Sequence, residues 1–382
     1  MGEYYYVSGR DDRYSQFSSF LETMGLSGAF ICGTLGNDSM LQYITGRCSN
    51  VIIGTYYLTF PTRGEPTLFL GDLSREATRN RYISKSNDFW VKQTRLNTWE
   101  DIAAQFIADD LCRKKIGIQA SSISLEAYNK LVSCLSDIEF VDISQAFKQY
   151  MMVNDKISME FANKSLNIVE QTYQEFRSYV KHGFSIIEAR ALLDYIMYRK
   201  VTGSTYNVLL QYIRKPFYNV PENAEAFCEG DIYSFEISAT YGNSSTQRIY
   251  DVCIGEENPE FSSLFFANKS AIEKISTILH PGLSTSDIVK TCDDVICSLG
   301  FIPPSEFAPS PIGHLMGMSS GAGTIYAKEP YTLKSDMIIV IHPSAKSRET
   351  GHYLFGPSML YRITDSGAIA YHDPQTEIDI LS

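Results

Sequence analysis

Two short segments, Gly183-Phe-Ser-Ile-Ile-Glu188 and Gly282-Leu-Ser-Thr-Ser-Asp287, repeat one pattern in the second half of the chain. Each places a serine three residues before an acidic residue, so that both side chains can cap exposed N–H groups at the start of a helix. Each segment also follows a long helical pattern and precedes apolar runs that are typical of strands. We therefore predict an internal duplication, with two unrelated helix starts as the alternative.

A long amphipathic helix is expected ahead of the first segment. Its apolar residues recur at spacings of 3 and 4, which is the period of a helix with one buried face: Met159, Ala162, Leu166, Val169, Tyr173, Phe176 and Val180. This helix is predicted to open the second domain.

One predicted strand in each half ends in an ionisable residue. These strands are Asp231-Ile-Tyr-Ser-Phe-Glu236 and Met337-Ile-Ile-Val-Ile-His342. A titratable group that closes an apolar strand costs desolvation energy unless it is paired or functional. If the two halves are related by approximate symmetry, we expect Glu236 and His342 to meet.

The first part of the chain shows a different pattern, in which helices and strands alternate. A helix is expected over residues 14–24, with Gly25 as its stop. Short apolar runs and one further helical stretch follow, at residues 28–32, 51–59, 66–70, 115–118, 125–135 and 139–142. A length of 382 residues suits two domains. We predict an α/β domain over residues 1–150 and a second domain over residues 151–382.

The composition narrows the class of partner. With 33 basic and 44 acidic side chains the formal charge is −11, which argues against binding to nucleic acids or anionic membranes. No apolar stretch approaches the roughly 18 residues of a membrane span, and we expect a cytoplasmic protein. The eight cysteines contain no C-x-x-C pair and are expected to be reduced core thiols.

Several landmarks then occur in a fixed order: Tyr43-Ile-Thr-Gly46, Val153-Asn-Asp-Lys-Ile-Ser-Met-Glu160, Gly230-Asp231, Arg248, Gly313-His314-Leu-Met-Gly317 and Leu333-Lys-Ser-Asp-Met-Ile-Ile-Val-Ile-His-Pro343. In this order the chain resembles the creatinase, prolidase and aminopeptidase P family. The resemblance implies an α+β protein, with a creatinase-like α/β domain at residues 1–150 followed by a pita-bread domain at residues 151–382. The pita-bread fold is a duplicated αββ unit with a pseudo-twofold axis. A homodimer is also implied.

Most members of this family hold two divalent metals with two Asp, one His and two Glu, because bridging carboxylates balance the charge of the metals. The resemblance carries these positions onto Glu236, then Ser245 or Gln247, then His314, His342 and Ser358. One carboxylate cannot bridge two dications and leave the site electrically balanced. The resemblance therefore implies a divergent member that lacks the usual dinuclear site.

Creatinase is the precedent within the family for acid/base catalysis without metals. The creatinase residues are replaced here as well, because Asn219, Gln247 and His342 stand at their positions. Its chemistry therefore cannot be transferred unchanged.

Glu236, His314 and His342 still form a workable acid/base set, because histidine exchanges protons near neutral pH and a carboxylate can stabilise its cation. We expect one Glu–His ion pair with the second histidine neutral. The interpretation is a metal-independent hydrolase or lyase acting at a C–N bond of a small amino-acid-like or amidine-type substrate. Buried structural histidines in an inactive site are the alternative.

The other candidate residues would contact the substrate. Arg248 could hold a substrate carboxylate, or pair with an acid inside the domain. Neutral side chains at the former ligand positions could hydrogen-bond substrate: Asn219, Ser245, Gln247 and Ser358.

Two further alternatives stay open. One is a single metal held by Glu236, His314 and His342, although no cofactor is otherwise expected. The other is a non-catalytic pita-bread protein that binds a peptide or protein partner.

Overall fold

The computed structural model describes residues 9–33, 39–46, 55–70, 90–91, 93–200, 206–212, 217–218, 226–230, 232–242, 244–307, 312–318, 323–326, 328 and 330–381. The chain divides into two compact units, Met1–Met151 and Met152–Ser382. Each unit has its own buried apolar core.

The amino-terminal unit is built on a six-stranded mixed sheet in the order β4-β3-β2-β1-β5-β6. Its elements are α1 (Arg10–Thr23), β1 (Gly28–Gly33), α2 (Ser39–Thr45), β2 (Tyr56–Pro61), β3 (Thr67–Leu70), β4 (Gln93–Leu96), α4 (Trp99–Ala108), β5 (Lys115–Ile118), α5 (Leu125–Cys134), β6 (Glu139–Asp142) and α6 (Ser144–Tyr150). β1 pairs with β2 antiparallel and with β5 parallel, and every residue of β1 is buried. The predicted alternation of helices and strands is thus present.

The first helix ends where the sequence predicts. Tyr14, Phe17 and Leu21 are buried on one face of α1. Gly25 adopts a φ of 70°, a left-handed conformation that glycine accepts without strain. Met24, the last residue of the predicted helix, is exposed and lies just beyond Thr23, where α1 ends.

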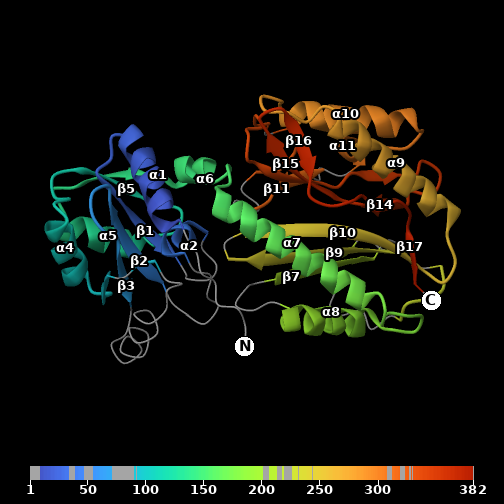
Figure 1. The fold of residues 1–382 in the computed structure, drawn as a ribbon, viewed down its shortest axis with the longest axis horizontal. Helices are drawn as coiled ribbons and strands as arrows, with labels where there is room; N and C mark the ends of the chain where they lie inside the picture. The colour runs from blue at the N-terminus through green and yellow to red at the C-terminus, as the bar shows by residue number, and fades with distance from the viewer. Residues whose placement is uncertain are drawn as a thin grey trace. The chain divides into compact units, whose positions relative to one another are not determined.

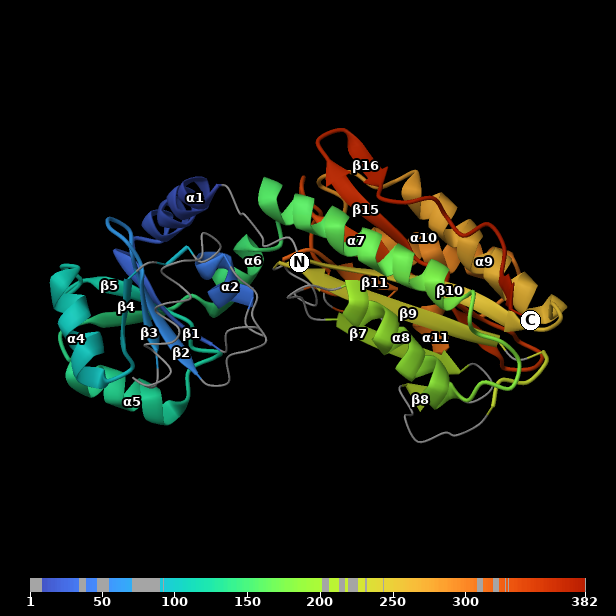
Figure 2. The ribbon, with the colours of Figure 1, turned by 60° about the horizontal axis from the view of Figure 1, so that its bottom comes forward.

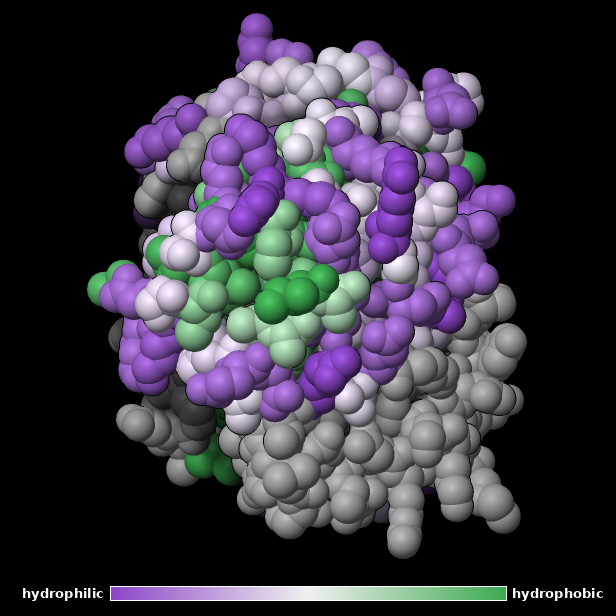
Figure 3. Space-filling view, turned by 90° about the vertical axis from the view of Figure 1, so that its left-hand side faces the viewer, coloured by the Kyte–Doolittle hydropathy of each residue, from purple (hydrophilic) through white to green (hydrophobic). Residues whose placement is uncertain are grey.

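Apolar side chains gather into a patch on the face of the amino-terminal unit drawn in Figure 3, with hydrophilic residues around it. Exposed large apolar residues of this unit include Ile107 on α4, and Leu125 and Val132 on α5.

The described residues of the carboxy-terminal unit form three sheets, in the orders β17-β10-β9-β7-β8, β11-β12-β15-β16 and β13-β14. Its helices are α7 (Lys156–Phe176), α8 (Ile186–Lys200), α9 (Pro259–Ser276), α10 (Thr285–Ser298) and α11 (Pro304–Phe307). Its strands are β7 (Tyr206–Tyr212), β8 (Phe217–Tyr218), β9 (Ile232–Tyr241), β10 (Ser244–Ile254), β11 (Gly313–Leu315), β12 (Ile338–Ile341), β13 (Ser344–Lys346), β14 (Tyr353–Phe355), β15 (Met359–Thr364), β16 (Gly367–Ala370) and β17 (Asp379–Leu381). Figures 1 and 2 show α7 and α8 along the five-stranded sheet, and α9 and α10 over the strands of the second half.

The two halves of this unit repeat one arrangement, which confirms the pita-bread fold. Ser185 and Glu188 cap each other's backbone N–H groups at the start of α8, at 2.8 and 3.1 Å. Ser284 caps α10 at the equivalent place. Each serine also makes an isolated β-bridge to a later segment of its own half, Ser185 to Ala226 and Ser284 to Thr332.

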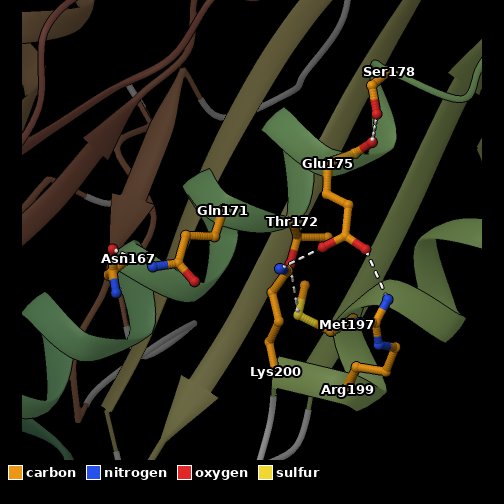
Figure 4. Close-up of polar contacts among 8 residues, drawn as sticks. All are labelled: Asn167, Gln171, Thr172, Glu175, Ser178, Met197, Arg199 and Lys200. Carbon is orange, nitrogen blue, oxygen red and sulfur yellow. Dashed lines mark hydrogen bonds and ion pairs between the residues drawn. The ribbon is translucent and has the colours of Figure 1, made fainter.

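Five of the seven residues of the predicted stripe are buried in α7: Ala162, Leu166, Val169, Tyr173 and Phe176. Met159 is partly buried, and Val180 is buried but follows the end of the helix. The other side of the same helix is polar. There Glu175 contacts Lys200 at 2.7 Å and Arg199 at 2.9 Å, so that two cations from the last turn of α8 meet one carboxylate (Figure 4). These contacts are partly exposed, so we assign the stability of the α7–α8 pair mainly to the buried stripe.

No helix in the described part of the chain is long and apolar enough to cross a membrane. No disulfide bond links the seven cysteines of the described residues, and Cys48 lies outside them. The prediction that the cysteines lie in the core is wrong for three of them. Cys134 and Cys297 are on exposed helix faces, and Cys228 is exposed in the segment before β9.

Candidate active site

Glu236 and Gln247 share one face of the β9–β10 hairpin. Strand pairing places Glu236 opposite Ile249 and Ser238 opposite Gln247. Because side chains opposite one another point to the same face, Glu236 and Gln247 are diagonal neighbours on it. Both are buried, with 8% and 4% of their surface exposed.

The opposite face of β9 explains one error in the sequence interpretation. Glu236 was expected to close its strand, but it lies in the middle of β9, which continues to Tyr241. Phe235, Ile237 and Ala239 belong to the apolar core with α7 and α8, and they keep the strand buried beyond the carboxylate. The ionisable residue therefore marks the other face of the sheet, and not its end.

The second half supplies His314, His342 and Ser358. His314 lies on β11 opposite Val340 of β12, and His342 directly follows β12, two residues after Val340. Ile341 pairs with Met359, so the register continues to His342 beside Ser358 on the face that also holds Val340. The ring centroids of the two histidines lie 5.4 Å apart.

Direct hydrogen bonds join the two halves. The Ser358 hydroxyl accepts from the Ile249 N–H at 2.7 Å, and Ile249 is the residue opposite Glu236. Ser245 and Gly317 exchange two backbone hydrogen bonds, at 3.0 and 2.8 Å. Gly317 has a φ of 79°, and a Cβ there would stand 2.1 Å from Asn154 Oδ1, so only glycine fits this approach. These bonds place β10, which pairs with the strand of Glu236, against the segment that carries Ser358.

Burial favours the neutral form of all three titratable groups. It raises the pKa of Glu236 to about 7. Burial and the nearby His314 ring lower the pKa of His342 to about 3. Burial also lowers the pKa of His314, against a hydrogen bond to the Leu315 carbonyl. No charge interaction between Glu236 and either histidine contributes to these shifts, so the expected Glu–His ion pair is not seen and burial favours the uncharged form of each group.

Several polar atoms of this interface have no hydrogen-bond partner within the described residues. They are Nδ1 and Nε2 of His342 and Nε2 of Gln247. The residues that the structure describes also contain no group of three or more His, Cys, Asp or Glu side chains able to hold a metal ion.

The remaining residues that were predicted to contact the substrate are Arg248, Ser245 and Asn219. Arg248 is on the opposite face from Glu236, where it contacts Glu170 of α7 at 2.7 Å and the Asp373 carbonyl at 2.7 Å. This is the internal pairing that the sequence also allowed. Ser245 shares a hydrogen bond with Thr240, at 2.6 Å. Asn219 lies outside the described residues.

The sequence reasoning missed one carboxyl group on the same face. Asp251 is fully buried opposite Ser234, whose hydroxyl donates to Oδ1 at 2.5 Å. Burial raises its pKa to about 7. The signal was available, because Asp251 lies four residues after Gln247 in one strand and therefore faces the same way.

The comparisons with known proteins agree with this architecture. Residues 160–373 match the model of metallopeptidase family M24, and residues 13–153 match the creatinase/prolidase N-terminal domain. The chain therefore belongs to the M24 family, whose prolidase-like and aminopeptidase P-like members are hydrolases. No curated protein sequence matches it.

Solved structures share the fold at low sequence identity. An X-Pro aminopeptidase from Thermotoga maritima MSB8 has a TM-score of 0.80 at 17% identity, covering 96% of this chain and 99% of that one. A recombinant prolidase from Thermococcus sibiricus has a TM-score of 0.79 at 16% identity over 100% of both chains. An Xaa-Pro dipeptidase from Bacillus anthracis has a TM-score of 0.77 at 14% identity, covering 97% and 100%.

Proposed function

We propose that this family member is a hydrolase that works without the dinuclear metal pair. Glu236, His314 and His342 would act by acid/base catalysis on a C–N bond of a small amino-acid-like or amidine-type substrate. The observation that carries the proposal is the set of polar and titratable side chains where the two halves meet. It contains one buried carboxyl group, two histidines whose pKa values are lowered by burial, a glutamine and a serine.

These residues do not fit two divalent cations. A dinuclear site needs bridging carboxylates, and the amide of Gln247 and the hydroxyl of Ser358 supply none. The Ser358 oxygen is already used as the acceptor for the Ile249 N–H. Gln247 is neutral, so its amide supplies no negative charge to balance a second cation.

The remaining groups suit proton transfer in hydrolysis. A carboxyl with a pKa near 7 can donate and recover a proton at neutral pH, so Glu236 would protonate the leaving nitrogen. An uncharged histidine has one ring nitrogen able to accept a proton from the attacking water. The water oxygen bonds to the substrate carbon, the C–N bond breaks, and the proton on the histidine returns to Glu236.

Turnover in the presence of a chelator tests this proposal. Release of ammonia or amine would be followed for a panel of small amidines, carboxamides and Xaa-Pro dipeptides, before and after treatment with EDTA. We expect a small substrate whose turnover survives EDTA and is lost in Glu236→Gln, and no cleavage of Xaa-Pro dipeptides. Cleavage of Xaa-Pro dipeptides that EDTA abolishes would overturn the proposal.

The second candidate function is a non-catalytic protein that binds a peptide or protein partner in the old substrate site. The low pKa of His342 favours it, because a histidine with a pKa of about 3 is a weak base. Absence of turnover across the panel, with retained peptide binding, would select this function. The implied homodimer remains a prediction that sedimentation equilibrium can test.

A further inference from the structure

The exposed face of α8 carries an apolar stripe. Ile187, Tyr195 and Tyr198 expose 44%, 60% and 69% of their surface, and Ala191 is exposed between them. Their spacings of 4, 4 and 3 residues place the four side chains on one side of the helix. Figure 1 shows α8 at the lower edge of its unit, with α7 above it. The stripe is therefore a continuous surface feature, unlike apolar residues that are scattered singly.

The opposite face of the same helix is apolar as well. Five residues of α8 belong to the core beneath it: Ile186, Ala189, Leu193, Ile196 and Met197. A surface helix normally has a polar outer face, and a helix that is apolar on both faces is normally covered on both. The stripe therefore indicates that a further surface covers α8.

The charged residues beside the stripe form two pairs of opposite sign. At the helical period, Glu188 and Arg199 flank the stripe on one side, and Arg190 and Asp194 flank it on the other. The two members of each pair lie at similar distances from a point between residues 192 and 193, in opposite directions along the helix. The same point is the middle of the apolar stripe.

A twofold axis at this point makes the charges complementary to themselves. It places a second α8 antiparallel to the first, and the same flank of both helices then lies on the same side of the contact. Glu188 faces Arg199 of the partner subunit, and Arg190 faces Asp194 of the partner subunit. A parallel arrangement would instead bring each charge against its own copy.

The apolar side chains match in the same register. Ile187 lies opposite Tyr198 of the partner subunit. Ala191 lies opposite Tyr195 of the partner subunit, and its small side chain leaves room for that ring. Large and small side chains that alternate across a contact allow two helices to pack closely.

Contacts within the chain leave these charges accessible. Arg190 contacts Asp194 at 3.2 Å, and their side chains expose 35% and 32% of their surface. Arg199 contacts Glu175 of α7 at 2.9 Å (Figure 4), and its side chain exposes 57%. A guanidinium has five N–H donors, so it can bind a carboxylate of a second chain without giving up the first.

We propose that the exposed face of α8 binds the same face of a second copy of this chain, as an antiparallel helix pair around a twofold axis. Tyr195 and Tyr198 supply apolar area, and tyrosine suits an interface because its hydroxyl can stay in water at the edge. α8 packs on the face of β9 that holds Phe235 and Ile237, opposite Glu236. The pairing therefore does not depend on the proposed function.

Sedimentation velocity of the full-length protein over a micromolar range of concentrations measures this association. We expect dimers of the wild type. Tyr195→Glu should weaken dimerisation by about a hundredfold, because the twofold axis repeats each lost contact. Leu125→Glu is the matched control, since Leu125 exposes 76% of its surface on α5 of the amino-terminal unit. This variant should dimerise like the wild type.

Two charge variants test the antiparallel register. Arg190→Asp leaves two acidic residues on that flank, and Asp194→Arg leaves two basic residues. Either variant alone meets like charges in the dimer and should dimerise about tenfold more weakly than the wild type. An equimolar mixture of the two brings opposite charges together at both contacts and should recover wild-type dimerisation. Loss of the contact within each chain cannot produce this recovery, because mixing does not restore it.

The other outcomes overturn the inference. They are a monomeric wild type, unchanged dimerisation of Tyr195→Glu, and a mixture that dimerises no better than its components. Loss of dimerisation in Leu125→Glu with retention in Tyr195→Glu would move the interface to the amino-terminal unit. Circular dichroism would confirm that each variant is folded, and the charge variants decide the test if Tyr195→Glu is not.

Discussion

The Ser358 hydroxyl accepts a hydrogen bond from the main-chain N–H of Ile249, 2.7 Å away. This bond joins the residue just before β15 of the second half to β10 of the first, at the position where the family resemblance places a metal-binding glutamate. A hydrogen bond internal to the protein thus connects the halves at a point where metal ligands are expected.

Ser358→Ala should destabilise the carboxy-terminal unit by about 1–3 kcal/mol, because the buried Ile249 N–H loses its acceptor. The change is measured by urea unfolding that is monitored by far-UV circular dichroism. Ser298→Ala is the control, since the Ser298 hydroxyl is exposed on α10 and bonds only to the Val295 carbonyl of its own helix. Equal stability of the two variants would contradict the structural role of Ser358.

His342→Leu should leave the unfolding free energy unchanged or raise it by about 1 kcal/mol, because the variant removes unpartnered buried nitrogens and keeps the apolar contact with Phe355. The same variant should abolish turnover of any substrate found. A marked fall in melting temperature would show that His342 has a structural partner, and would favour the non-catalytic function.

Asp251 should make stability depend on pH. In the unfolded chain the pKa of an aspartate is about 3.9, whereas in the folded protein burial raises the pKa of Asp251 to about 7. The folded state holds the Asp251 proton more tightly than the unfolded state does. The stabilisation that results is therefore complete below about pH 4 and is lost as the pH rises to about 7.

Asp251→Asn removes this dependence. The stability of the variant relative to the wild type should increase by up to about 1.4 kcal/mol per pH unit across that window. Urea unfolding at about pH 4.5 and about pH 7.5 measures it. The exposed Asp287→Asn serves as control. A difference between wild type and Asp251→Asn that is the same at both pH values would show that Asp251 is ionised in the folded protein.

Arg248→Met should lower stability and leave substrate affinity unchanged. The guanidinium contacts Glu170 and the Asp373 carbonyl, and it lies 4.9 Å from the centre of the Tyr250 ring. All three contacts are on the face away from Glu236, so we expect a lower melting temperature and an unchanged KM. A large rise in KM with an unchanged melting temperature would return Arg248 to the substrate site.

The fold could be predicted because its signals are periodic and local. The stripe from Ala162 to Phe176 required one buried helical face, and the paired caps at Ser185 and Ser284 marked the two halves. The site was harder, because it depends on strand register. The sequence could not decide between Ser245 and Gln247, and the hairpin register places both on the face of Glu236.

Protonation was not predictable from residue types. From residue types we predicted an ion pair between Glu236 and a histidine. Burial instead shifts the pKa values of Glu236 and His342 toward their neutral forms. The depth of burial comes from the packing of β9, β12 and β15 in three dimensions. The spacing of four residues from Gln247 already placed Asp251 on the same face, but its hydrogen bond from Ser234 depends on the pairing of β9 with β10.

The metal content of the full-length protein tests the central claim most directly. The protein would be incubated with excess Mn, Co, Zn and Fe in turn, separated from free metal by gel filtration and subjected to elemental analysis. With Gln247 and Ser358 at ligand positions, we predict far less than two equivalents of any metal per chain. Two tightly bound equivalents per chain would contradict the account.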